Sequence, residues 1–262
     1  MTASENQTSI HHSASDGFSS GSETYSQGRP DYPPAVEEWL RRDLGLSSGK
    51  LVVDLGSGTG KFLPRLKGTG AAILAVEPVD AMRAALTRAH PDVDAKAGSA
   101  QDIPLPDASA DAVVCAQSFH WFSTAEALAE IRRVLKPGGA LGLIWNVRDE
   151  SVDWVAELTR LITPYEGDTP RYHTQAWRSV FPAPGFGPLT EKHFPSGHSG
   201  TTEQVILKRI LSVSFIAALP EDERQKISEQ VWALIRRHPA LAGRGQVTFP
   251  YETAAFCCLK TA

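Results

Sequence analysis

Residues 51–60 read Leu-Val-Val-Asp-Leu-Gly-Ser-Gly-Thr-Gly, and this stretch constrains the fold more than any other part of the chain. Its apolar beginning is typical of a parallel strand that is covered on both faces. Gly56, Gly58 and Gly60 then allow a tight turn and leave no Cβ atom in the way of a ligand. A helix that begins after the glycines would turn its first amide groups toward the loop. Strand, turn and helix together predict a pocket for the polar part of a nucleotide.

Two kinds of nucleotide ligand compete for a glycine turn of this type. The dinucleotide fingerprint has the order Gly-x-Gly-x-x-Gly, whereas here Lys61 stands at the third glycine position and Gly60 comes one residue early. Asp54, two residues before the first glycine, would repel a pyrophosphate and attract an ammonium group. The pattern Asp-x-Gly-x-Gly-x-Gly resembles motif I of the class I S-adenosylmethionine-dependent methyltransferases, whose cofactor is a sulfonium amino acid without a phosphate.

A second acidic residue, Glu77, ends the apolar run of residues 71–77. An acid at the end of the second strand accepts hydrogen bonds from the ribose hydroxyls of a nucleotide. Dinucleotide enzymes and methyltransferases both have this feature, so Glu77 supports nucleotide binding without separating the two families.

Apolar runs and helical patterns alternate along the chain. This order predicts an α/β fold with a doubly wound (Rossmann-like), mostly parallel sheet of seven strands and helical cap insertions. The expected strands begin at residue 51 and cover residues 71–77, 93–98, 111–116, 140–145, 189–194 and 248–259. The main expected helices cover residues 36–44, 80–89, 123–135, 154–164, 202–218 and 221–237.

Further motifs resemble the same methyltransferase family over roughly residues 25–150. The helix of residues 123–135 is followed by Lys-Pro-Gly-Gly, and the ending Arg-Val-Leu-Lys-Pro-Gly-Gly before a strand strongly resembles class I methyltransferases. With Gln-Ser-Phe-His-Trp-Phe at 117–122 and Trp-Asn-x-Arg at 145–148, the chain resembles the branch that includes trans-aconitate and related small-molecule methyltransferases. The resemblance implies S-adenosyl-L-methionine as cofactor and S-adenosyl-L-homocysteine as product.

The resemblance also implies a cofactor site. Arg29, in a Tyr-x-x-x-Arg-Pro segment, would neutralise the cofactor carboxylate, and Tyr25 would line the donor pocket. The segment 98–106 looks like the part of the family that meets the adenine ring. The full set of expected cofactor-binding residues is Tyr25, Arg29, Asp54, Gly56, Ser57, Gly58, Gly60, Glu77, Pro78, Ser99, Ala100, Gln101 and Gln117.

An unusually aromatic loop, residues 117–122, follows the fourth strand. In open α/β sheets the ligand lies at the carboxyl ends of the strands. His120 is therefore the candidate catalytic residue, either as a general base or as a hydrogen-bond donor to the substrate, because an imidazole titrates near neutral pH. A histidine that only packs is the alternative. The candidate acceptor contacts are Trp121, Trp145, Asn146, Tyr172 and Trp177.

The length of 262 residues suits one α/β domain. Residues 1–23 are rich in Ser, Thr, Gly and Asn, which predicts a disordered N-terminal tail. Residues 24–262 are expected to form a single methyltransferase domain, with an N-terminal lid at 24–45 and a cap insertion at about 150–187.

The composition argues against several classes of binding partner. A net charge of -4 gives no general attraction for nucleic acid or an anionic membrane, and no apolar run is long enough to span a bilayer. The three cysteines have neither a disulfide nor a zinc spacing, so no metal site is expected. The first basic residue is Arg29, which argues against a secretory signal. We expect a cytoplasmic monomer or homodimer that acts on a small molecule.

The predicted function is methyl transfer to an O, N or C nucleophile of a small-molecule acceptor by in-line displacement. Three alternatives stay open: an RNA or protein methyltransferase on the same fold, a nicotinamide dehydrogenase, and a non-catalytic module that has kept the fold.

Overall fold

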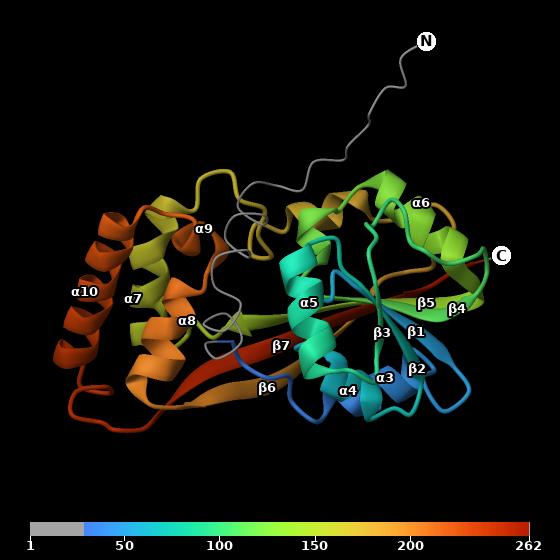
Figure 1. The fold of residues 1–262 in the computed structure, drawn as a ribbon. Coiled ribbons are helices and arrows are strands. Elements are labelled where there is room, and N and C mark those ends of the chain that lie inside the picture. The colour runs from blue at the N-terminus through green and yellow to red at the C-terminus, as the bar shows by residue number, and fades with distance from the viewer. Residues whose placement is uncertain (1–28, 262) are drawn as a thin grey trace, which may run out of the picture.

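The computed structural model describes residues 29–261 (Figure 1). The predicted tail at 1–23 and Tyr25 lie outside the described residues.

One sheet of seven strands forms the centre of the molecule, in the order β3-β2-β1-β4-β5-β7-β6. Strands β1 to β5 are parallel, and β7 runs antiparallel to both β5 and β6. The predicted mostly parallel, doubly wound sheet is confirmed. The strands are β1 Leu51–Leu55, β2 Ala72–Val76, β3 Asp94–Lys96, β4 Ala110–Ala116, β5 Leu135–Arg148, β6 Thr190–Gly200 and β7 Val247–Leu259.

Helices cover both faces of this sheet. On one face, α3 (Val36–Arg42), α4 (Leu63–Lys67) and α5 (Asp80–Ala89) bury their apolar sides. On the other face lie α6 (Ala125–Val134) and the 3-10 helix η3 (Ala176–Val180). Because neighbouring residues of a strand point to opposite faces, Cys257 and Cys258 belong to different cores, as the alternation of β7 predicts.

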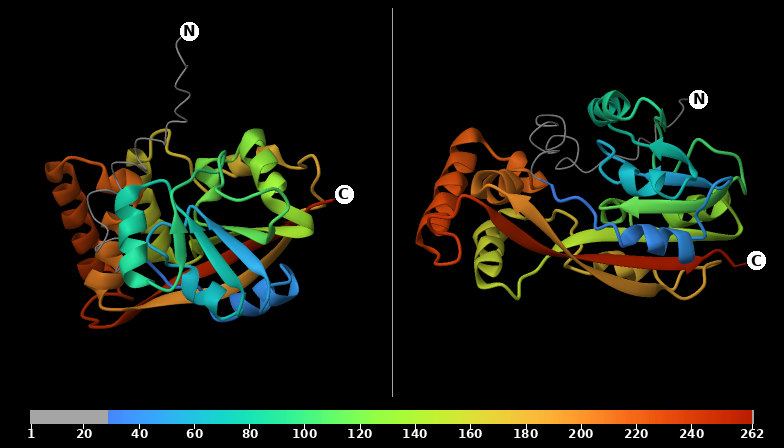
Figure 2. Two further views of the ribbon diagram at one scale, coloured as in Figure 1. Left: turned by 45° about the vertical axis from the view of Figure 1, so that its right-hand side comes forward. Right: turned by 90° about the horizontal axis from the view of Figure 1, so that it is seen from below.

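A layer of helices gathers at one end of the molecule, beside the ends of β6 and β7 (Figures 1 and 2). These helices pack around a hydrophobic core of their own, to which β7 adds Phe249 and Tyr251. Of these helices, only the one at residues 153–162 lies within the predicted cap at about 150–187. The layer consists of α7 (Asp153–Ile162), the π-helix η4 (Glu203–Leu207), α8 (Lys208–Leu211), α9 (Ser214–Ala217) and α10 (Glu221–Arg237).

Two details of the helices differ from the expectation. The single helix expected at 202–218 is broken at Ser212, whose hydroxyl donates to the Arg209 carbonyl (2.8 Å), while Val213 takes an extended conformation. Such a bond from a serine competes with the helical backbone. The N-cap of α6 is Thr124 rather than Ser123, because the Thr124 hydroxyl accepts the amide of Ala127 at 3.2 Å.

Candidate active site

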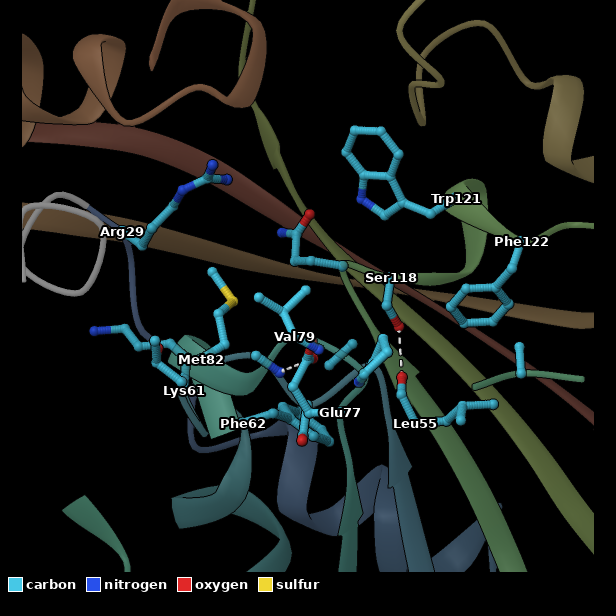
Figure 3. Close-up of a pocket in the computed structure, with 18 of the residues that line it drawn as sticks. Arg29, Leu55, Lys61, Phe62, Glu77, Val79, Met82, Ser118, Trp121 and Phe122 are labelled. Carbon is cyan, nitrogen blue, oxygen red and sulfur yellow. Dashed lines mark hydrogen bonds between the residues drawn. The ribbon is translucent and has the colours of Figure 1, made fainter. Parts of the chain in front are cut away.

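A cavity of about 210 Å³ opens at the carboxyl ends of the parallel strands (Figure 3). Most of its wall consists of the segments that follow β1, β2, β3 and β4. The rest is formed by Met82 of α5 and by Arg29, Pro30, Tyr32, Asn146 and Arg209. Between β1 and β4 the order of the strands reverses. Doubly wound sheets bind their ligands at such a reversal.

The glycine loop after β1 needs its glycines for two physical reasons. Gly56, Gly58 and Gly60 have φ angles of +70°, +57° and +84°, in the left-handed region that other residues rarely adopt. A Cβ atom on Gly56 would also lie 2.7 Å from the Cβ of Ser118. Gly56 and Gly58 line the cavity, whereas Gly60 does not and instead packs against His90.

Glu77 joins the glycine loop to the start of α5. Its Oε2 accepts the amide of Gly58 at 2.8 Å, and its Oε1 accepts the amide of Val79 at 2.9 Å. The side chain lines the cavity although the residue is only 6% exposed. Burial raises its pKa, and the two amide hydrogen bonds and Arg83 oppose that shift. A carboxylate has about four lone-pair positions, so Glu77 keeps capacity to accept hydroxyl groups from a ligand.

Asp54 occupies an unusual environment at the end of β1. The residue is 0% exposed, and neither carboxyl oxygen has a hydrogen-bond partner within residues 29–261. Burial, and secondarily the charge of Glu77, raise its pKa to about 7. Asp54 does not line the cavity itself. It supplies a buried acid two residues before Gly56, whose charged form a nearby cation would favour.

The N-terminal segment 29–32 is fixed across the cavity. Tyr32 packs edge-on against Phe62 with 4.7 Å between ring centroids, and Asp31 pairs with Lys61 at 2.7 Å. Arg29 donates from Nη2 to a carbonyl of the α8–α9 connection at 2.8 Å. In Figure 3, Arg29 and Glu77 stand on different sides of the pocket. The segment thus links the sheet to the helical layer.

A second cavity, of about 90 Å³, lies beside the first. It is lined by the end of β5, the loop after β4, residues 171–173, Arg29, and two residues of the helical layer, Arg209 and Ser214. The two cavities adjoin, because five residues line both: Arg29, Gln117, Trp121, Asn146 and Arg209.

His120 lines the second cavity, and its protonation state follows from one hydrogen bond. The Nε1 of Trp145 lies 3.0 Å from the Nδ1 of His120. An indole nitrogen only donates, so Nδ1 is the acceptor and the hydrogen of the neutral ring is on Nε2. Burial, with the charges of Arg171 and Arg29, lowers the pKa of His120 to about 3. At neutral pH His120 is therefore a hydrogen-bond donor through Nε2, whereas a base would need a free nitrogen.

The predicted acceptor contacts separate into two groups. Trp121, Asn146 and Tyr172 line the second cavity. Trp145 and Trp177 line neither cavity. Both are 1% exposed and pack in the core, with their rings tilted by 33° and 4.7 Å between the ring centroids. Burial of their apolar surface in the core stabilises the fold more than exposure in a hydrated pocket would. Trp145 contacts the site only through its hydrogen bond to His120.

Asn146 holds three parts of the site together. Its Oδ1 accepts the hydroxyl of Thr253 at 2.6 Å, and its Nδ2 lies 3.5 Å from the carbonyls of Pro30 and Asp31. Gln117, with a φ of +59°, donates to the Asn146 carbonyl at 3.2 Å. The boundary between the cavities is thereby fixed by β4, β5, β7 and the N-terminal segment.

Three arginines of the second cavity are not among the site residues that the sequence predicts. Arg148 ends β5, Arg171 follows α7, and Arg209 lies in α8. Burial lowers the pKa of Arg148 to about 10 and of Arg171 to about 9, and neighbouring arginines add to both shifts. Only Arg148 stood within a predicted motif. Arg171 lies in the connection between η2 (Thr163–Tyr165) and η3, and Arg209 lies in α8, where local patterns reveal packing but not which side chains meet.

The remaining expected cofactor residues line the first cavity: Ser57, Pro78, Ser99, Ala100, Gln101 and Gln117. Cavity residues that the motifs did not single out include Lys61, Val79, Met82, Ser118 and Phe122. In the described part of the chain, no group of three His, Cys, Asp or Glu side chains is arranged to hold a metal ion. No helix from residue 29 to residue 261 has the length and apolar character needed to cross a membrane.

Some known proteins are similar to this chain in sequence, and others are similar to it in fold. Residues 53–143 match the family model described as a methyltransferase domain. An uncharacterized methyltransferase-like protein of Schizosaccharomyces pombe is 38% identical over 90% of this chain and 92% of its own length. An uncharacterized methyltransferase of Mycobacterium tuberculosis is 38% identical over 90% of this chain and 92% of its own length.

A solved structure described as a type II methyltransferase, from Anaeromyxobacter dehalogenans, covers 88% of this chain and 96% of its own, with a TM-score of 0.63. Its sequence identity of 23% shows a shared fold alone. The identity to the curated relatives extends over nearly the whole chain. The chain belongs to the class I S-adenosylmethionine-dependent methyltransferases.

Proposed function

We propose that this methyltransferase transfers the methyl group of S-adenosyl-L-methionine to an O, N or C atom of a small-molecule acceptor. The observation that carries the proposal is the pair of adjoining cavities with five residues in common. In an in-line displacement the nucleophile, the methyl carbon and the sulfur lie on one line. Donor and acceptor therefore need two sites that meet over a short boundary.

The residues of the first cavity fit this cofactor. Glu77 has lone pairs left for two ribose hydroxyls, and Asp54 places a negative charge near the glycine loop for the cationic amino-acid end. The cofactor supplies a methyl group that the positive charge on its sulfur has already activated. The protein has to align the acceptor and exclude water, and such positioning can contribute about 7–11 kcal/mol.

His120 is proposed to orient the acceptor rather than to remove a proton from it. Its Nδ1 is engaged by Trp145 and its Nε2 carries the hydrogen, so no lone pair is left for a proton. A donor at this position suits an acceptor that presents an oxygen lone pair to the second cavity. Of the two roles that the sequence leaves open, the hydrogen bond favours the donor.

The size of the second cavity supports a small acceptor. A volume of about 90 Å³ corresponds to roughly seven water molecules at about 10–15 Å³ each. An acceptor of that size is a metabolite or a small reactive part of a larger molecule.

Calorimetry of the full chain with S-adenosyl-L-homocysteine tests the donor site. We expect binding that Glu77→Ala weakens at least tenfold, with Glu229→Ala, an exposed glutamate of α10, as the matched control. NAD should not compete. If S-adenosyl-L-homocysteine does not bind, or if NAD binds more tightly, the proposal is refuted.

The acceptor class is tested with a labelled donor. The chain is incubated separately with the small-molecule fraction, the RNA and the protein of a cell extract, and the label is followed. We expect label in the small-molecule fraction. Label only in RNA or protein would exclude a small-molecule acceptor.

A further inference from the structure

Four arginines from distant parts of the chain meet around the second cavity. Arg29 comes from the N-terminal segment, Arg148 from the end of β5, Arg171 from the connection after α7, and Arg209 from α8. Among the described residues, the cavity has a single carboxylate in its wall, that of Glu150. The wall is therefore strongly cationic in a protein whose formal net charge is -4.

Carboxylates compensate three of these arginines only weakly, because Glu150 acts on Arg148 and Glu166 acts on Arg171 from beyond ion-pair distance. Within residues 29–261, none of Arg148, Arg171 and Arg209 forms an ion pair with a carboxylate. The Nη1 atoms of Arg148 and Arg209 are buried and have no hydrogen-bond partner in the described chain. Like charges in a medium of low dielectric constant repel one another, and a buried charge without a partner is costly. The cluster opposes folding unless something negative enters it.

The guanidinium groups are nevertheless held in place. Arg209 is only 6% exposed, and its Nε donates to the hydroxyl of Tyr251 at 3.1 Å. The guanidinium carbon of Arg171 lies 5.0 Å from the centroid of the Phe215 ring. These contacts fix two of the positive groups without neutralising them. The hydrogen-bond donors of these guanidinium groups are thus arranged before any ligand binds. This arrangement distinguishes a binding site for an anion from a solvated patch of positive charge.

We propose that the second cavity binds a carboxylate or phosphate group of the methyl acceptor, which is therefore a small anion. This inference rests on the proposed function, because the second cavity is assigned to the methyl acceptor on the ground that it adjoins the donor cavity. Guanidinium groups bind both kinds of oxyanion through pairs of parallel hydrogen bonds. The Nε2 hydrogen of His120 adds a neutral donor in the same cavity.

The arrangement also explains how the two substrates are held next to each other. Arg29 and Arg209 line both cavities, so two arginines lie at their boundary. A negative acceptor on that side and a positive sulfonium on the other attract each other. The donor charge thus favours binding of an anionic acceptor over a neutral molecule of the same shape.

The experiment titrates the full chain, saturated with S-adenosyl-L-homocysteine, with citrate and with inorganic phosphate at constant ionic strength. Glucose is the uncharged control, and sodium chloride controls for non-specific anion binding. The variants are Arg148→Gln and Arg171→Gln, which line only the second cavity, and Arg236→Gln, an exposed arginine of α10, is the matched control. Circular dichroism verifies the fold of each variant.

We expect citrate or phosphate to bind, and each of the two cavity variants to weaken that binding at least tenfold. Affinity for S-adenosyl-L-homocysteine should change less than twofold. Citrate binding alone assigns a carboxylate, and phosphate binding alone assigns a phosphate.

Binding of neither anion by the wild-type chain, or equal binding by the cavity variants and Arg236→Gln, overturns the inference. The anion titrations are repeated without S-adenosyl-L-homocysteine. If that compound does not bind, the proposed function fails, while the same variants still decide whether the cavity is an anion site.

Discussion

Replacement of Asp54 by asparagine should stabilise the unliganded protein at pH 8. Asp54 is 0% exposed and lacks hydrogen-bond partners among the described residues. Its pKa is raised from 3.8 to about 7, first by burial and then by the charge of Glu77. In the unfolded chain the same carboxyl group returns to its ordinary pKa. Ionisation of Asp54 therefore favours the unfolded state.

The magnitude follows from the difference between the two pKa values. About 3 pH units at 1.36 kcal/mol per unit give a penalty of about 4 kcal/mol above pH 7. The folded protein binds more protons between the two values, so the contribution of Asp54 to stability falls as the pH rises from about 4 to about 7. A buried asparagine amide without partners still costs about 1–3 kcal/mol. The expected net gain at pH 8 is therefore about 1–3 kcal/mol.

Urea unfolding at pH 8 and pH 4.5 measures this gain, with Asp94→Asn, an exposed aspartate of β3, as the matched control. At pH 4.5 folded Asp54 is protonated, so the gain should be about 3 kcal/mol smaller than at pH 8. A gain of equal size at the two pH values would refute the electrostatic reasoning, as would destabilisation by the substitution at pH 8.

The same carboxylate is expected to contribute to binding of the donor. A cationic ligand near the glycine loop would lower the pKa of Asp54, so that binding at pH 6 releases close to one proton. Calorimetry of S-adenosyl-L-homocysteine binding in two buffers of different ionisation enthalpy counts that proton. Asp54→Asn should release none and should bind at least tenfold more weakly. Equal proton release by both proteins would show that another group titrates.

Two further substitutions test other parts of the site, and a third, Gly138→Ala, is a control outside it. Gly56→Ala combines a φ of +70° with a Cβ 2.7 Å from Ser118, so it should cost about 2–4 kcal/mol in urea unfolding. Gly138→Ala, with a φ of +74° and nothing within 4 Å, isolates the backbone cost and should lose about 1 kcal/mol. Glu77→Gln turns an amide NH₂ toward the amide of Gly58 or Val79, and its stability should fall by about 1–3 kcal/mol in the same assay. The ring of His120 should stay neutral from pH 5 to pH 8, with its hydrogen on Nε2, and nitrogen chemical shifts that titrate near pH 6.5 would contradict that assignment.

Much of the first cavity was predictable because its determinants are local. A glycine that needs a positive φ, an acid at the end of a strand and a loop after it are all encoded within a few residues. Gly56, Gly58 and Glu77 accordingly line the cavity that the sequence predicts. Tyr25 stays a prediction, since it lies outside the described residues.

The second cavity was predicted only in part. Its aromatic loop could be located, but the roles of its members depend on partners that are far away in the sequence. Trp145 and Trp177 are tryptophans like Trp121, yet they pack in the core, because their rings contact each other and Phe256. No local pattern distinguishes these cases.

The sequence by itself determined the alternation of strands and helices, the glycine turn and the acid that follows β2, since each depends on backbone geometry or on periodicity along the chain. The tertiary structure decided which nitrogen of His120 carries the hydrogen, because Trp145 reaches it from β5. It also decided that Arg148, Arg171 and Arg209 share one cavity. Charge at a site is a sum over side chains that only folding brings together.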